Sequence, residues 1–251
     1  MSELAVILAT YNEAENLTQL VEALESLRED LQLVVVDDNS PDGTGLVAQQ
    51  LASRFGNITI VKRPAKQGLG SALQTGLAKA LDAGALYVMT MDADLSHDPG
   101  DVPRLLSIIK TGSADMVQGS RYAPGGGIRG WNRKRRLLSR AANLVYHWGA
   151  GTPQECTTNF RVFSRSVAKA VLSRAKGSGY EFMAESTLLV MAAGFKIKEV
   201  PIIFTGWLSG ESKLDQRQVL KGIFLCGANV LRYWIHLGRF SSRASDAPAL
   251  D

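Results

Sequence analysis

Residues 31–43 read LQLVVVDDNSPDG, and the change of character within this stretch is the first indication of the fold. Its first six residues are mostly apolar and rich in valine, as in a strand that is buried on both faces. The rest is an acidic run of residues that favour tight turns. In open α/β sheets, ligands bind beyond the carboxyl ends of such strands.

The same unit recurs on both sides of this stretch. Further strands are predicted over residues 4–9, 58–61, 86–91 and 116–119, and helices over 14–29, 44–55, 69–81 and 101–110. The second half is less regular, with helices expected over 135–148, 167–173 and 184–193 and strands over 160–163 and 197–204. Strands that alternate with helices require crossover connections, which predicts an α/β fold with a mostly parallel central sheet flanked by helices.

Composition narrows the class of protein. The chain has 251 residues, of which 45% are hydrophobic and 21% charged, enough for one large α/β domain. The N-terminus lacks the features of a signal peptide. Two cysteines without a CxxC pair indicate a reducing compartment, and three widely spaced histidines argue against a zinc site.

Charge divides the chain into two unlike halves. Residues 1–115 carry 16 acidic and 8 basic side chains, whereas residues 116–251 carry 8 acidic and 20 basic ones. An acidic half can hold a metal ion and a nucleotide. A basic half can meet phosphates, a membrane or nucleic acid.

Acidic residues stand at the ends of two predicted strands. Asp92-Ala93-Asp94 follows an apolar strand, and two carboxylates so spaced can converge on one Mg²⁺ ion together with substrate phosphates. The alternative is an acidic turn that caps the next helix. Asp37-Asp38 alone is more typical of a turn. Because acidic residues follow two strands of the same sheet, the interpretation that both face one ligand-binding cleft is favoured.

The glycines of Gly68-Leu69-Gly70-Ser71 do not indicate a dinucleotide site. Leu73 stands where that fingerprint has its third glycine, and the first strand is followed by a turn without glycine. Close packing of the loop against the helix start is the better interpretation, with Lys66 near a phosphate.

The basic stretch of residues 129–140 has three interpretations: a solvated helix face, a nucleic-acid surface or a phosphate site. Its aromatic content is thin, with Trp131 alone, and no nucleic-acid motif is present. Arg135 and Ser139 share a helix face because they are four residues apart. Arg121, at the end of a predicted strand, can meet them across a cleft.

The C-terminal part carries two further features. Residues 206–213 (GWLSGESK) form a polar loop in which Lys213 can cover a phosphate. Residues 216–240 have an apolar face and a basic face, and the longest charge-free run, residues 222–231, is far below the ~20 residues that span a bilayer. This pattern suits an interfacial helix or a core-packed terminal helix.

These motifs together resemble dolichol-phosphate mannosyltransferases (polyprenol monophosphomannose synthases), a branch of the inverting family 2 glycosyltransferases. The resemblance runs nearly end to end. It is carried by ATYNEAENL, VVVDDNSPDGT, KQGLGSALQTG, MDADLSHDP, GSRYAPGGGIRGWNRKRRLLSRAAN, FRVF, EVPIIF and GESKL.

The resemblance implies a GT-A fold that transfers mannose from GDP-mannose to a polyprenyl or dolichyl phosphate with inversion. By position, the implied donor site contains Tyr11, Glu13, Val36, Asp38, Asp92, Ala93, Asp94 and Lys213. Asp92, Asp94 and Ser96 would hold Mg²⁺ or Mn²⁺, and Arg121, Arg135 and Ser139 would bind the acceptor phosphate. Asp92, Asp94 and Arg121 are thus the expected catalytic residues.

The resemblance also implies a domain organisation and a cellular location. A catalytic domain is expected over residues 1–214, with a nucleotide-sugar and metal half (1–115) and an acceptor half (116–214). An amphipathic helix (215–240) and a disordered tail (241–251) follow. The protein is expected at the cytoplasmic face of a membrane, and short members of this branch can depend on a membrane-anchored partner subunit. No nucleic-acid partner is expected.

Several residues depart from the pattern of the branch. Trp207 stands where an arginine is usual, and Glu155 and the run 157–159 differ from the usual Asp and small-residue loop. These departures keep two alternatives open, the same chemistry with another sugar or acceptor and a non-catalytic nucleotide-sugar-binding subunit.

Overall fold

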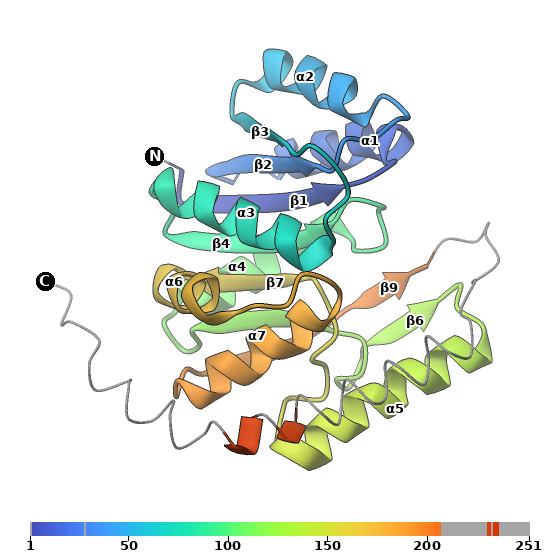
Figure 1. Cartoon of the computed structure of the whole chain (residues 1–251), viewed down its shortest axis with the longest axis vertical. Helices are drawn as coiled ribbons and strands as arrows, with labels where there is room; N and C mark the ends of the chain where they lie inside the picture. The colour runs from blue at the N-terminus through green and yellow to red at the C-terminus, as the bar shows by residue number, and fades with distance from the viewer. Residues whose placement is uncertain (1, 28, 207–229, 232, 236–251) are drawn as a thin grey trace, which may run out of the picture.

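A mixed β-sheet forms the centre of the protein, as seen in a computed structural model that describes residues 2–27, 29–206, 230–231 and 233–235 (Figure 1). Within these residues its strands run in the order β3-β2-β1-β4-β7-β5-β8. Their bounds are β1 Leu4–Thr10, β2 Leu31–Asp37, β3 Ile58–Lys62, β4 Tyr87–Asp92, β5 Met116–Ser120, β7 Arg161–Ser164 and β8 Ile197–Pro201. The expected α/β architecture with a mostly parallel sheet is confirmed.

Strand β7 is the exception to the parallel order. Strands β1 to β4 are mutually parallel, and β5 is parallel to β8, but β7 lies antiparallel between β4 and β5. Its register places Arg161 opposite Thr90 of β4. Because β7 runs the opposite way, the residues that precede it lie beside the carboxyl end of β4.

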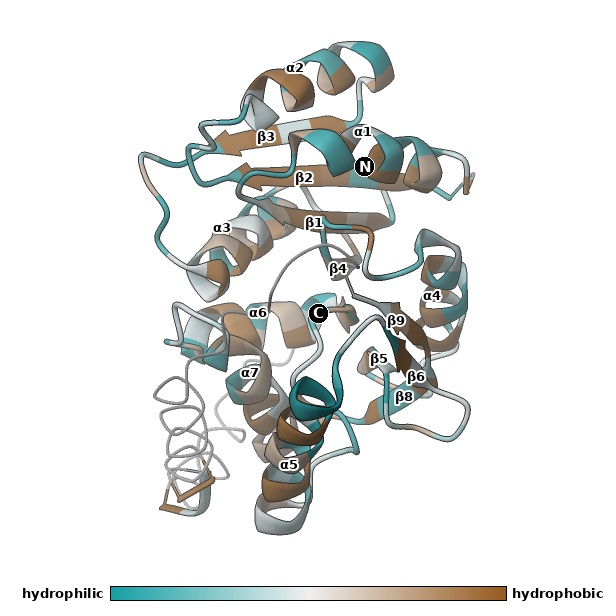
Figure 2. Cartoon of the chain, turned by 90° about the vertical axis from the view of Figure 1, so that its right-hand side faces the viewer, coloured by the Kyte–Doolittle hydropathy of each residue, from teal (hydrophilic) through white to brown (hydrophobic). Residues whose placement is uncertain are grey.

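Helices cover both faces of the sheet (Figure 1). Helices α1 (Ala14–Glu25), α2 (Thr44–Phe55) and α4 (Val102–Lys110) pack on one face, and α3 (Leu69–Asp82), α6 (Arg165–Arg174) and α7 (Glu181–Ala192) on the other. Strand β1 serves both layers, because alternate side chains point to opposite faces. Leu4, Val6 and Leu8 join the first core, and Ala5 and Ile7 the second. Figure 2 shows hydrophobic residues concentrated in these strands.

A second, small sheet stands beyond the carboxyl ends of the central strands (Figure 1). It pairs β6 (Gly127–Arg129) with β9 (Ile203–Thr205), and α5 (Arg133–Ala150) follows β6. The strand expected over residues 197–204 is therefore two strands. The break falls at buried Ile202, whose N–H donates to Ser120 O (3.0 Å) and whose carbonyl accepts from Gly127 N (2.9 Å). Strand β6 was not predicted, since three residues carry no measurable periodicity.

Close packing explains the glycine at the start of α3. A Cβ atom on Gly70 would lie 2.4 Å from Gly177 O and 2.7 Å from Phe182 Cβ. This contact confirms the packing interpretation of the Gly68–Ser71 sequence.

The C-terminal expectations fall mostly on residues that the structure does not describe. Residues 230–231 and 233–235 are helical, while the other residues of the expected helix and the tail lie outside the described residues. Within the described part of the chain, no helix has the length and hydropathy of a membrane span.

Candidate active site

The carboxyl end of β4 presents the Asp92-Ala93-Asp94 sequence. Asn159, on the segment that leads into β7, donates from Nδ2 to Asp92 Oδ1 at 2.9 Å. The Ser96 amide donates to Asp94 Oδ1 at 3.0 Å. Among the described residues, none donates a hydrogen bond to the second oxygen of either carboxylate, so each acid keeps one oxygen available to a cation.

The electrostatics of this edge favour a bound cation. Burial raises the pKa of Glu13, and the nearby charges of Asp94 and Asp92 raise it further. Burial also raises the pKa of Asp92, against the Asn159 hydrogen bond and the charge of Arg121, which lower it. The Ser96 hydroxyl is buried and has no hydrogen-bond partner in the described structure. A hard cation such as Mg²⁺ or Mn²⁺ would relieve this repulsion.

The donor set fits a metal ion that is completed by its substrate. No group of three or more His, Cys, Asp or Glu side chains within the described residues is arranged to hold a metal by itself. Two carboxylates therefore need further oxygens from a ligand. Mg²⁺ usually binds in this way, through one or two carboxylates plus phosphate oxygens.

The expected nucleoside residues lie on the neighbouring strand ends. Asp38 is buried and pairs with Arg63, and its Oδ2 accepts from the Gln67 amide at 3.2 Å. Tyr11 is 37% exposed, with Lys66 Nζ 4.0 Å from its ring centroid. Val36 is fully buried within β2, so the structure does not bring it to the surface of the site.

A cavity of about 300 Å³ joins the acidic edge to the basic residues. It is lined by Leu69, Asp92, His97, Arg121, Trp131, Arg135, Ser139, Thr157, Thr158, Asn159, Tyr180, Met183 and Phe204. The structure thus brings Asp92 together with the three residues expected to bind a phosphate. Lys213 and Trp207 lie outside the described residues.

The two guanidinium groups of the cavity differ in their partners. Arg121 is buried and donates from Nε and Nη2 to the two carboxylate oxygens of Glu155 at 2.7 and 2.8 Å. Its Nη2 also reaches Thr157 Oγ1 at 2.8 Å. The Glu155 charge raises the pKa of Arg121, although burial opposes it, and Arg121 in turn lowers the pKa of Glu155. The charge of Arg121 is therefore compensated inside the protein.

Arg135 lies against an aromatic ring instead. Its Cζ is 4.0 Å from the centroid of Trp131, and Arg121 Cζ is 5.2 Å from the same ring. Among the described residues, no carboxylate forms an ion pair with Arg135. Burial and the charge of Arg121 lower its pKa. An arginine of this kind is available to an anionic ligand.

His97 forms part of the cavity floor without carrying charge. It is buried, stacks on Phe160 with ring centroids 5.0 Å apart, and accepts a hydrogen bond at Nδ1 from the Asp92 amide (3.4 Å). Burial lowers its pKa to about 3. His97 is therefore neutral at physiological pH and supports the Asp92 backbone.

Several cavity residues were not predicted as functional. Glu155 and residues 157–159 were noted in the sequence because they depart from the pattern of the branch, but no function was predicted for them. Trp131 stood out only as the lone aromatic residue of the basic stretch. Phe204 ends the EVPIIF motif but had no predicted role, and Tyr180 had no signal in the sequence. Their placement depends on the antiparallel β7 and on the small sheet.

The family of the chain follows from comparison with known proteins. A model described as glycosyl transferase family 2 matches residues 5–172. The chain belongs to glycosyl transferase family 2. This family 2 glycosyltransferase is 37% identical over 222 residues to polyprenol monophosphomannose synthase of Mycolicibacterium smegmatis, covering 87% of this chain and 83% of that protein. It is 36% identical over 211 residues to undecaprenyl-phosphate mannosyltransferase of Micrococcus luteus, covering 83% and 86%.

Solved structures confirm the GT-A fold of this family 2 glycosyltransferase. Glucosyl-3-phosphoglycerate synthase from Mycobacterium tuberculosis, in complex with Mn²⁺, UDP and its glucosylated product, matches with a TM-score of 0.66 at 17% identity, over 92% of this chain and 80% of that one. A mannosyltransferase from Pyrobaculum calidifontis, in complex with GDP-Man and Mn²⁺, matches with a TM-score of 0.61 at 17% identity, over 99% and 76%.

Proposed function

We propose that this protein transfers mannose from GDP-mannose to a polyprenyl phosphate, with inversion at the anomeric carbon. One observation carries the proposal: a single cavity joins the carboxylate end of β4 to Arg121, Arg135 and Ser139. An anionic donor and an anionic acceptor must approach each other in this reaction, and the cavity has the charges for both. The names of the two curated relatives support this choice of sugar and acceptor.

The donor would occupy the acidic side. Tyr11, Glu13 and Asp38, which follow the neighbouring strands β1 and β2, would bind the nucleoside. Asp92 and Asp94, with Ser96 and the main chain of Ala93 beside them, would hold Mg²⁺ or Mn²⁺. The ion, when bound, neutralises the charge that develops on the leaving diphosphate. The Mn²⁺ in the complexes of two structural neighbours with the GT-A fold supports a divalent cation here.

The acceptor would occupy the basic side. Arg135 forms no ion pair with any described carboxylate, and Ser139 lies one turn further along α5. Arg121 contributes through Nη1, because its Nε and Nη2 already bind Glu155 and Thr157. The phosphate would therefore bind mainly to Arg135, between Ser139 and Nη1 of Arg121.

The reaction needs no strong general base. The second pKa of a phosphate monoester is near 6, so at neutral pH the acceptor is largely a dianion. An acceptor oxygen forms a bond to the anomeric carbon, the bond from that carbon to the β-phosphate breaks, and GDP leaves with the electron pair. Attack opposite the leaving group turns an α-linked donor into a β-linked product. The enzyme supplies position and charge neutralisation.

The outer face of α5 supports work at a membrane surface. Trp148 is 83% exposed and Leu137 69%, and Leu144 and Val145 are also exposed. Arg133, Lys134, Arg136 and Arg140 are exposed on the same helix. Apolar residues that are flanked by basic ones suit the interface of an anionic bilayer. We place this face against the cytoplasmic leaflet, with Arg135 and Ser139 turned toward the cavity.

A transfer assay tests the proposal. Purified protein, radiolabelled GDP-mannose, polyprenyl phosphate in detergent and Mn²⁺ or Mg²⁺ are mixed, and label is counted in the organic phase. Label should appear only when metal and acceptor are both present, and GDP-glucose should not replace GDP-mannose. Absence of transfer by folded protein would reject this donor and acceptor pair.

A further inference from the structure

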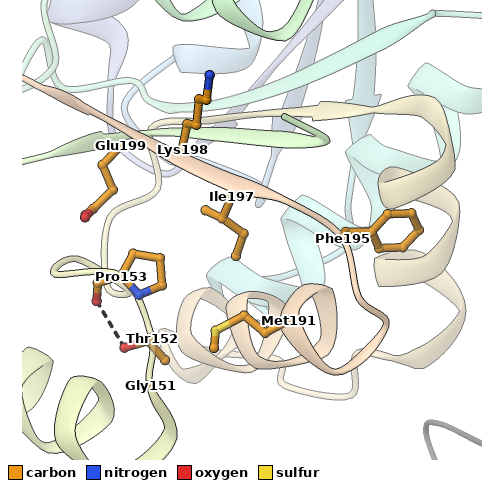
Figure 3. A pocket seen from close by; sticks show the side chains of 8 residues that line it. All are labelled: Gly151, Thr152, Pro153, Met191, Phe195, Ile197, Lys198 and Glu199. Carbon is orange, nitrogen blue, oxygen red and sulfur yellow. Dashed lines mark hydrogen bonds between the residues drawn. The ribbon is translucent and has the colours of Figure 1, made fainter. Parts of the chain in front are cut away.

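Glu199 of β8 lies outside the active-site cavity, yet its carboxylate holds the loop that supports this cavity. The amides of Gln154 and Glu155 donate to Glu199 Oε2 and Oε1 at 3.0 and 2.9 Å. Figure 3 shows Glu199 extending toward the loop that carries Pro153, with Lys198 pointing away. Glu199 belongs to a separate cavity of about 520 Å³, lined by Gly151, Thr152, Pro153, Met191, Phe195, Ile197, Lys198 and Glu199.

A cross-strand pair clamps the main chain of Glu155. Gln118 of β5 and Glu199 of β8 are register partners in the parallel ladder. The Gln118 side chain donates from Nε2 to the Glu155 carbonyl, while Glu199 accepts from the Glu155 amide. Both polar groups of one loop residue are thereby fixed to the sheet. A buried loop without such partners would carry a large desolvation cost.

The clamp continues along the loop. Asn143 of α5 accepts from the Cys156 amide at 2.7 Å, and Glu155 Oε1 accepts from the Thr157 amide at 3.1 Å. Four successive amides, of residues 154–157, therefore each donate to a side-chain carboxylate or amide oxygen. The orientation of the Glu155 side chain depends on this fixed backbone.

The fixed backbone of residues 154–157 determines the position of the Arg121 guanidinium through Glu155. Glu155 is fully buried and receives two hydrogen bonds from Arg121, so the position of the guanidinium follows that of the carboxylate. Arg121 lines the cavity, whereas Glu199 does not. Hydrogen bonds thus form an uninterrupted chain from Glu199 through the main chain of Glu155 and its carboxylate to Arg121.

We propose that Glu199 is a positioning residue for acceptor binding, which acts through Glu155 on Arg121. This inference rests on the proposed function, since it takes the acceptor phosphate to lie beside Arg121. Loss of the Glu199 carboxylate shifts residues 154–155 and with them the guanidinium. A displaced guanidinium weakens phosphate binding and leaves the donor and metal residues on β1, β2 and β4 in place.

The test compares Glu199→Gln with Asp115→Asn in the full chain. Asp115 is a matched control, because its carboxylate accepts a hydrogen bond from the Lys196 amide (2.8 Å) at the start of strands β5 and β8. This hydrogen bond involves no residue of the active-site cavity and no residue of the loop 154–157. Initial rates are measured against polyprenyl phosphate and, separately, against GDP-mannose. Glu199→Gln should raise the KM for polyprenyl phosphate about tenfold and leave the KM for GDP-mannose unchanged. Asp115→Asn should change neither KM.

Hydrogen exchange supplies a readout that does not depend on activity. The amides of Gln154 and Glu155 should exchange faster in Glu199→Gln than in the wild type, and those of β1 and β2 should not. Glu199→Asp keeps the charge on a shorter side chain, and it should show the same selective rise in KM if Glu199→Gln does not fold.

Two results separate the possible failures. The role of Glu199 in acceptor binding would be overturned if Glu199→Gln raised the KM values for both substrates equally. It would also be overturned if the KM for polyprenyl phosphate stayed at the wild-type value. A wild type that moves no mannose to polyprenyl phosphate would reject the proposed function and the acceptor role with it, whatever the exchange rates show.

Discussion

Asn159 donates a 2.9 Å hydrogen bond to Asp92, which joins the loop before β7 to the acid that ends β4. Asn159 is itself held, because Thr90 donates to its carbonyl at 2.6 Å. The bond occupies Asp92 Oδ1 and leaves Oδ2 for a cation. A partner that orients a ligating carboxylate commonly changes metal affinity when it is removed.

Asn159→Ser should therefore weaken metal binding, because the shorter side chain cannot reach Asp92. The dissociation constant for Mn²⁺ in the presence of GDP should rise at least about tenfold, measured from free Mn²⁺ by electron paramagnetic resonance. Asn57→Ser is the control, since Asn57 donates to the Glu25 carboxylate (2.9 Å) away from the site. Equal Mn²⁺ affinity in the two variants would show that Asp92 does not need Asn159.

Asp94→Ala should abolish metal-dependent transfer without unfolding the chain. Asp94 follows β4, and within the described part of the chain its carboxylate accepts one hydrogen bond, from the Ser96 amide, so the fold loses little. Asp82→Ala, at an exposed position at the end of α3, should retain full transfer. Retained turnover in Asp94→Ala, with a melting temperature close to that of the wild type, would remove Asp94 from the site.

Arg135→Ala should raise the KM for polyprenyl phosphate by roughly 10- to 100-fold, because a charge-assisted contact to the phosphate is lost. Lys169→Ala, which removes an exposed cation of α6, is the control for net charge. Initial rates at varied acceptor concentration measure the effect. A KM that stays within twofold of the control would place the phosphate elsewhere.

The Glu155–Arg121 pair should give the protein a pH-dependent stability. The pKa of Glu155 is lowered in the folded state, mainly by Arg121 against the effect of burial. The stability from this group is therefore present above the unfolded value near 4.5 and is lost as the pH falls through the folded pKa. Glu155→Gln should lower the free energy of unfolding by about 3 kcal/mol at pH 7, and by progressively less below pH ~4.5.

Urea denaturation from pH 7 to pH 3.5 measures this difference. Glu22→Gln is the control, because Glu22 pairs with Arg54 at the surface, where such pairs contribute less than about 1 kcal/mol. A Glu155→Gln deficit that stays constant down to the lowest pH would contradict the assigned titration.

The α5 face should govern membrane binding. The double variant Leu144→Ser/Trp148→Ser removes two exposed apolar side chains and should bind anionic vesicles at least about tenfold more weakly in co-sedimentation. Leu46→Ser removes an exposed leucine from α2 and should bind like the wild type. Transfer to a short, water-soluble acceptor should persist in both. Unchanged vesicle binding in the double variant would assign the membrane contact to another surface.

Local patterns were sufficient to predict the parallel half of the sheet. The valine-rich run that ends at Val36 and the apolar run before Asp92 are long enough to show burial on both faces. Their polar ends had to share one edge once the strands were parallel. Asp92 and Arg121, which follow two of these strands, were accordingly expected at one cleft. Arg135 and Ser139 were expected there from their shared helix face and from the family resemblance, and all four residues line the cavity.

Long-range pairing decides the rest of the site. The direction of β7 follows from its partners β4 and β5, not from the sequence of residues 161–164. Without that direction, Asn159 cannot be placed beside Asp92. Likewise, the stack of Arg135 on Trp131 requires the small sheet, whose strands have three residues each.

The internal counter-ion of Arg121 has a consequence for turnover. Because the Glu155 carboxylate already neutralises Arg121, departure of a mannosylated lipid would leave no uncompensated charge at Arg121. Arg135, which is only partly enclosed, can exchange its ligand for water. On the proposed function, release of the product would therefore cost little electrostatic free energy at the buried Glu155–Arg121 pair.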